Sequence, residues 1–92
     1  MLSQRLQEFL TTWCNPETEP EYTAGMLGGP GGAYYRDWLP QELLTAVRSR
    51  ELNPQTMGAL ADLGFTDQAG VDEWLRSVWP LWFTGPFPGL TS

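Results

Sequence analysis

The sequence predicts an all-α fold, a small bundle of four short helices with a long Gly/Pro-rich loop and an extended aromatic tail at the C-terminal end. Three observations predict it. Apolar residues recur every three or four positions along four stretches, as on a helix with one buried face. Residues that favour helix starts and stops flank these stretches. Glycine and proline gather after the first stretch and at the end of the chain.

The first predicted helix covers residues 2–14. Asn15-Pro16 ends it, because the residue before a proline is driven out of the helical conformation. A membrane-surface helix would carry several Lys or Arg side chains on its polar face, and this stretch carries only Arg5. We therefore expect its apolar stripe to face the core. The stripe consists of Leu2, Leu6, Phe9, Leu10 and Trp13.

Three more helices follow in the second half of the chain. A proline is favoured in the first turn of a helix, asparagine and aspartate at the cap before it, and glycine just after its end. A proline beyond the last turn cannot donate a backbone hydrogen bond and stops the helix. The second predicted helix begins at Pro40 and ends near Arg50. The third is capped by Asn53 and ends at Gly64. The fourth is capped by Thr66 or Asp67 and ends at Pro80.

Residues 15–38 are predicted to form the loop. Glu17, Glu19 and Glu21 alternate around Pro20, a pattern typical of an extended segment. Their spacing does not match a calcium-binding helix–loop–helix, so we expect no metal there. The segment is either a solvated acidic loop or an acidic face that meets a basic partner. The glycines of residues 24–33 match neither nucleotide-binding pattern, which predicts turns rather than a phosphate site.

The segment 34–38 combines the residue types that are enriched at the energetic centres of protein interfaces. Trp38 is predicted to pack in the core. Tyr34 and Tyr35 fit either the core or an interface, and Arg36 is expected in water or against a partner.

The tail, residues 80–92, follows a helical domain of residues 1–79. Its aromatic residues stand among prolines, and left exposed they would form a large apolar patch. We therefore expect the tail to dock either on its own domain or on another chain. The aromatic residues that could contact a partner are Trp82, Phe83 and Phe87.

Composition narrows the function. The net charge of −6 repels nucleic-acid phosphates, so direct nucleic-acid binding is not expected, and a basic protein partner is favoured. The chain has no His and no Lys, and its one cysteine, Cys14, is predicted to be a small buried apolar residue. These absences predict no enzyme, no cofactor and no metal. No signal peptide or transmembrane stretch is recognisable, which predicts a cytoplasmic protein that does not bind membranes.

Residues 39–79 contain the stretches ELLTAV, LADLG and EWLRSV. In this order they resemble one group of small immunity proteins from contact-dependent growth inhibition systems. The resemblance covers less than half of the chain, and ubiquitin-associated domains also share the form of LADLGF. It implies a helical protein that blocks a toxin. It assigns no functional residue, because immunity proteins bind their own toxins through variable surfaces.

Two functions therefore remain. The first is a non-enzymatic acidic protein-binding module of the immunity or inhibitor type, which neutralises or regulates a protein partner. Its partner-binding residues would be the acidic and aromatic side chains named above: Glu17, Glu19, Glu21, Tyr34, Tyr35, Arg36, Trp82, Phe83 and Phe87. The alternative is a small structural subunit of a larger complex, anchored by its aromatic tail.

Overall fold

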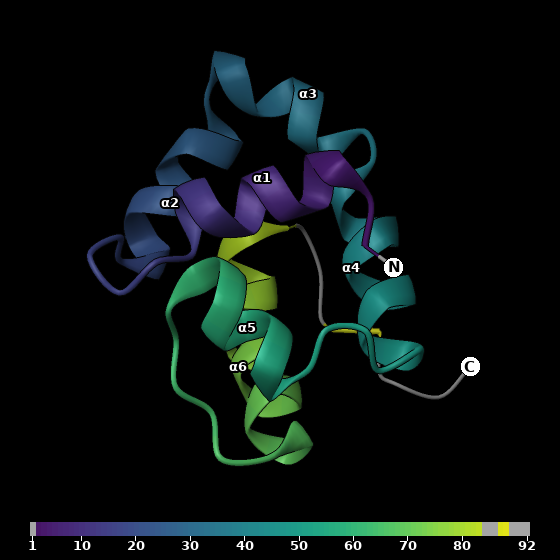
Figure 1. Ribbon diagram of the computed structural model, residues 1–92. Coiled ribbons are helices and arrows are strands. Elements are labelled where there is room, and N and C mark those ends of the chain that lie inside the picture. The colour runs from purple at the N-terminus through teal and green to yellow at the C-terminus, as the bar shows by residue number, and fades with distance from the viewer. Residues whose placement is uncertain (1, 84–86, 89–92) are drawn as a thin grey trace.

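The computed structural model describes residues 2–83 and 87–88, and within them every regular element is a helix (Figure 1). The predicted all-α fold is confirmed, but the count of four helices is wrong. Six α-helices and one 3₁₀-helix lie in the described residues. They are α1 (Gln4–Trp13), α2 (Pro20–Gly28), η1 (Pro30–Gly32), α3 (Ala33–Arg36), α4 (Leu39–Arg48), α5 (Pro54–Ala61) and α6 (Gln68–Trp82).

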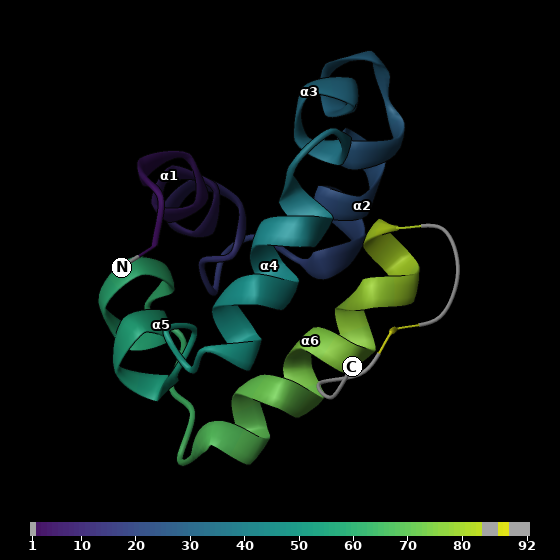
Figure 2. The same ribbon diagram turned by 90° about the vertical axis from the view of Figure 1, so that its right-hand side faces the viewer.

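The helices pack around one core, and the two main contacts between them join α1 to α5 and α2 to α6. In Figures 1 and 2, α1 lies above α5, and α1 also contacts α4. Figure 2 shows α2 beside the last turns of α6, the other main helix contact of the fold. The fully buried core residues Phe9, Leu27, Leu43 and Leu75 come from four different helices. Trp38 is also buried, as predicted, with 6% of its surface exposed.

Several helix ends lie where the sequence places them. Asn53 accepts a hydrogen bond from the backbone N–H of Thr56, and Asp67 accepts one from Gly70, so both predicted caps are confirmed. The predicted end at Gly64 is wrong. Helix α5 stops at Ala61, and Asp62 takes the left-handed conformation, with φ at 55°. Aspartate tolerates this conformation better than most residues.

The main correction concerns residues 15–38, which are mostly helical instead of a loop. Pro20 occupies the first turn of α2, where its fixed φ suits a helix and its missing N–H has no partner to lose. Thr23 and Leu27 then bury one face of α2 against the core. The alternating glutamates, from which an extended segment was predicted, are exposed, and their pattern does not indicate this buried face.

The second correction concerns Pro80, which does not end α6. The helix continues across the predicted domain boundary to Trp82. A proline inside a helix costs about 3 kcal/mol. Burying a tryptophan removes roughly 150–250 Å² from water, or about 4–6 kcal/mol at 25 cal/mol per Å². Trp82 is 5% exposed, so its burial outweighs the cost of the proline.

A close backbone approach between α2 and η1 generates a stability prediction. A Cβ atom on Gly32 would overlap the backbone oxygen of Leu27, whereas a Cβ on Gly31 would meet nothing within 4 Å. Gly32→Ala should therefore lower the free energy of unfolding by about 1–3 kcal/mol. The matched control Gly31→Ala should change it by less than about 0.5 kcal/mol. Urea unfolding followed by tryptophan fluorescence measures both, and equal stabilities would contradict this prediction.

Candidate functional site

The predicted partner-binding residues come from three segments of the chain. The three glutamates occupy the turn between α1 and α2 and the first turn of α2, and all three are exposed. Tyr34, Tyr35 and Arg36 belong to α3, beyond the other end of α2. In Figure 1 the turn lies at the left and α3 at the upper right. The tail aromatics form the third group, and Trp82 adjoins the other two, because it lines one hollow with Glu19 and another with Arg36.

The tail aromatics pack on their own domain. Trp82 is buried: its indole N–H donates to the backbone oxygen of Pro20 over 3.1 Å, and its ring meets Phe9 edge-on at 5.6 Å. Phe83 is half-buried, and Phe87 lies edge-on to Trp79 at 5.3 Å. Trp82 is therefore part of the core of its own chain, and its contact with a partner stays a prediction. The energetic gain from burying its ring is already realised within this chain.

On α3, all three predicted residues have contacts within the chain. Tyr35 is half-buried against Phe9, at 5.5 Å between ring centres. Arg36 donates to the backbone oxygen of Leu27, one of the last carbonyl groups of α2, which lack helical partners. Tyr34 is 58% exposed and packs edge-on against Tyr35. This surface therefore offers a partner one free aromatic ring.

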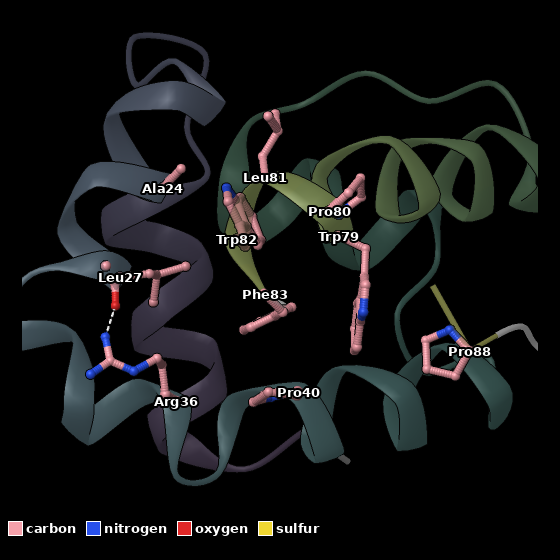
Figure 3. A pocket seen from close by; sticks show the side chains of 11 residues that line it. Ala24, Leu27, Arg36, Pro40, Trp79, Pro80, Leu81, Trp82, Phe83 and Pro88 are labelled. Carbon is pink, nitrogen blue, oxygen red and sulfur yellow. Dashed lines mark hydrogen bonds between the residues drawn. The ribbon is translucent and has the colours of Figure 1, made fainter. Parts of the chain in front are cut away.

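The largest hollow, about 680 Å³, lies between α2, the start of α4 and the end of α6. Figure 3 shows Trp79 and Phe83 projecting toward Pro40, whereas Leu81 points away. Arg36 is the one ionisable side chain among the described residues that line it, and Figure 3 shows its hydrogen bond to Leu27. A single cation that already binds a helix end supplies no acid–base pair for catalysis.

A smaller hollow has a more distinctive lining. The tryptophan hollow, as we name it, has a volume of about 200 Å³ and lies between the α1–α2 turn and α6. Three tryptophans and other apolar residues line it, together with residues of the turn. Its lining residues are Trp13, Trp74, Trp82, Leu63 and Cys14, with Asn15, Pro16, Thr18, Glu19 and Pro20.

An acidic depression adjoins this hollow. It has a volume of about 300 Å³ and is lined by Glu17, Thr18, Glu19 and Tyr22. Thr18 and Glu19 line both spaces, so the two adjoin at these residues. Tyr22 is 68% exposed and its ring stacks on Trp13, with 6.0 Å between centres and 27° between planes. We call the depression and its rim the acidic–aromatic surface, consisting of Glu17, Glu19, Glu21 and Tyr22.

Hydrogen bonds hold this region in place. The Asn15 side chain accepts from the backbone N–H of Glu17 and from the hydroxyl of Thr18, which fixes the turn. The buried hydroxyl of Thr23 donates to the backbone oxygen of Trp13 over 2.9 Å. The indole of Trp82 donates across to α2. The end of α1, the start of α2 and the last turn of α6 are thereby joined around the hollow.

The carboxylates of the acidic–aromatic surface are not neutralised within the described part of the chain. Ion pairs join Arg5 to Glu42 and Arg76 to Glu73, and none reaches the three glutamates among residues 2–83 and 87–88. Glu19 precedes α2 at its cap position, but its side chain makes no capping hydrogen bond. These carboxylates therefore remain available to a cation from outside.

Tyr22, Trp13 and Trp74 are the residues that sequence reasoning missed. Trp13 and Trp74 both fall on predicted apolar stripes, which assigns them to the core and hides their partial exposure. For Tyr22 a signal existed: Pro20 as the first residue of a helix would have placed this tyrosine in the exposed first turn, beside Glu19 and Glu21.

Within residues 2–83 and 87–88, no three His, Cys, Asp or Glu side chains gather closely enough to hold a metal ion. None of the helices in that part of the chain combines the length and the apolar character needed to cross a membrane. Comparisons with known protein families, curated proteins and solved structures found no match for this chain.

Cys14 lines the tryptophan hollow and is buried, which confirms the prediction that it is a small buried apolar residue. Burial raises the pKa of its thiol, because an apolar environment disfavours the charged thiolate. In an unfolded chain the pKa of a cysteine thiol is about 8.5. Above that pH the unfolded chain loses a proton that the folded chain keeps.

This difference predicts how stability depends on pH. The free energy of unfolding should be independent of Cys14 titration below pH ~8.5 and should fall by about 1.4 kcal/mol per pH unit above it. Cys14→Ala removes this component but keeps the contribution of every other titrating group. Urea unfolding of both proteins between pH ~8 and ~10 measures the difference between them. A difference that stays constant with pH would contradict the buried neutral thiol.

Proposed function

We propose that this protein is a non-enzymatic binding module that neutralises or regulates a basic protein partner, in the manner of an immunity or inhibitor protein. The observation that carries the proposal is the acidic–aromatic surface. Three exposed carboxylates without an internal cation lie beside a tyrosine ring that is 68% exposed and supported by Trp13. Exposed tyrosine and unpaired charge together are typical of a surface that another protein covers.

Electrostatics supports a basic partner. The net charge of −6 attracts a positive surface over a distance of about 8–10 Å at physiological salt, and this raises the rate of encounter. The stack of Tyr22 on Trp13 then offers a rigid ring, so little side-chain entropy is lost when a partner packs on it. In this scheme the charge steers the partner and the ring holds it.

The packing of the tail favours this function over a subunit anchored by its aromatic residues. Trp82 is buried within its own chain, and Phe83 and Phe87 pack against the same core. A tail anchor would need these rings free to insert into a neighbour. The described part of the tail thus offers the structural-subunit alternative no anchor.

The test is photo-crosslinking in cells that naturally produce the protein. A photoreactive phenylalanine derivative replaces Tyr22, and the same derivative replaces exposed Gln55 on α5 as the matched control. We expect the Tyr22 variant to capture one protein of high isoelectric point that the Gln55 variant does not capture. Captured proteins identical at the two positions, or none at Tyr22, would contradict the proposal.

Neutralising the charges then tests the steering role against the purified captured protein. The triple variant Glu17→Gln, Glu19→Gln and Glu21→Gln should lower the association rate about tenfold at low salt, and added salt should remove the difference. Stopped-flow fluorescence measures the rate. Because the three side chains are exposed and keep their size, the variant should unfold at the same urea concentration as the parent.

A further inference from the structure

The tryptophan hollow has a chemistry that the proposed binding function does not require. Trp13, Trp74 and Trp82 line one space of about 200 Å³, and Glu19, which carries a carboxylate, lines the same space. The rings of Trp74 and Trp82 also contact each other edge to face, with 5.7 Å between their centres and 83° between their planes. Aromatic walls combined with a carboxylate are the arrangement that proteins use to hold an organic cation.

The size of the hollow limits what can enter. Pockets for small-molecule ligands usually measure about 300–1,000 Å³, so a space of about 200 Å³ suits a single side chain better than a metabolite. Thr18 and Glu19 line both the hollow and the acidic depression, so the two spaces adjoin. A side chain reaching it from a partner on the acidic–aromatic surface would therefore pass the carboxylates first.

We propose that the tryptophan hollow receives one arginine side chain of the basic partner, with the guanidinium against the indole rings and Glu19 accepting its hydrogen bonds. This inference rests on the proposed function, because it names the group by which the partner is recognised. Arginine fits better than lysine for two reasons. A guanidinium is planar and weakly hydrated, so it stacks on indole and leaves water readily, and its paired N–H groups match a carboxylate.

The lining residues are arranged before any ligand arrives. The Trp82 ring is fixed by its hydrogen bond to Pro20, and the backbone of Trp13 is fixed by Thr23. Glu19 has neither a capping bond nor an ion pair within the described residues, so an incoming guanidinium displaces no internal contact of its carboxylate. Preorganised groups of this kind lose little entropy on binding.

The experiment uses the full chain and three short glycine peptides that differ in one central residue: arginine, citrulline or lysine. Citrulline has the shape of arginine without its charge. The side-chain N–H signals of the tryptophans, observed by NMR during titration, report binding at each ring. We expect the arginine peptide to shift the signals of Trp13 and Trp74 and to bind roughly two- to tenfold more tightly than either other peptide.

Two variants locate the site. Glu19→Gln keeps size and exposure and should weaken arginine binding at least about twofold, whereas Glu73→Gln, an exposed control on α6, should leave it unchanged. Trp74→Leu should abolish the preference for arginine, and its folding is checked by urea unfolding. Equal binding of arginine and citrulline, or an unchanged affinity in Glu19→Gln, would overturn the inference.

The two proposals fail in distinguishable ways. If a partner crosslinks at Tyr22 but the chain binds arginine and citrulline peptides equally, the binding function stands and the arginine site is wrong. If the arginine peptide binds selectively and no protein crosslinks at Tyr22, the cation site stands and the proposed function is wrong.

Discussion

The burial of Trp82 is the interaction on which the rest of this structure depends. Its ring packs edge-on against Phe9 of α1 and Trp74 of α6, and its N–H donates to Pro20 at the start of α2. One side chain thus joins α6 to the first two helices of the chain, which are far from it in sequence. It accounts for the continuation of α6 past Pro80, and it forms one wall of the tryptophan hollow.

The sequence predicted those helix ends that depend on interactions between residues close together in the chain. The caps at Asn53 and Asp67 were predictable because each side chain binds an N–H three residues along the chain. Helix α2 was not predicted, since Gly25 and Gly28 oppose a helix, and the burial of Thr23 and Leu27 against the core favours it. Packing against the core therefore stabilises this helix, and no pattern of neighbouring residues in the sequence indicates that packing.

The candidate site was predictable only in its charge. Composition correctly places exposed glutamates between the first two apolar stretches, but it does not show that Tyr22 stacks on Trp13 above them. The hollow beside them forms because α6 brings Trp74 to the end of α1, across about sixty residues of sequence. Side chains that lie so far apart along the chain carry no spacing by which sequence could relate them.

The five tryptophans differ in how far they are buried. A domain of 92 residues has little core, so it needs large apolar side chains to offset the entropy of folding. Trp38, Trp79 and Trp82 are buried and serve this need, whereas Trp13 and Trp74 remain half-exposed. The half-exposed pair rests on the buried core and is held rigid by it. In the proposed cation site, this pair of rings would present an aromatic surface beside Glu19, next to the buried ring of Trp82.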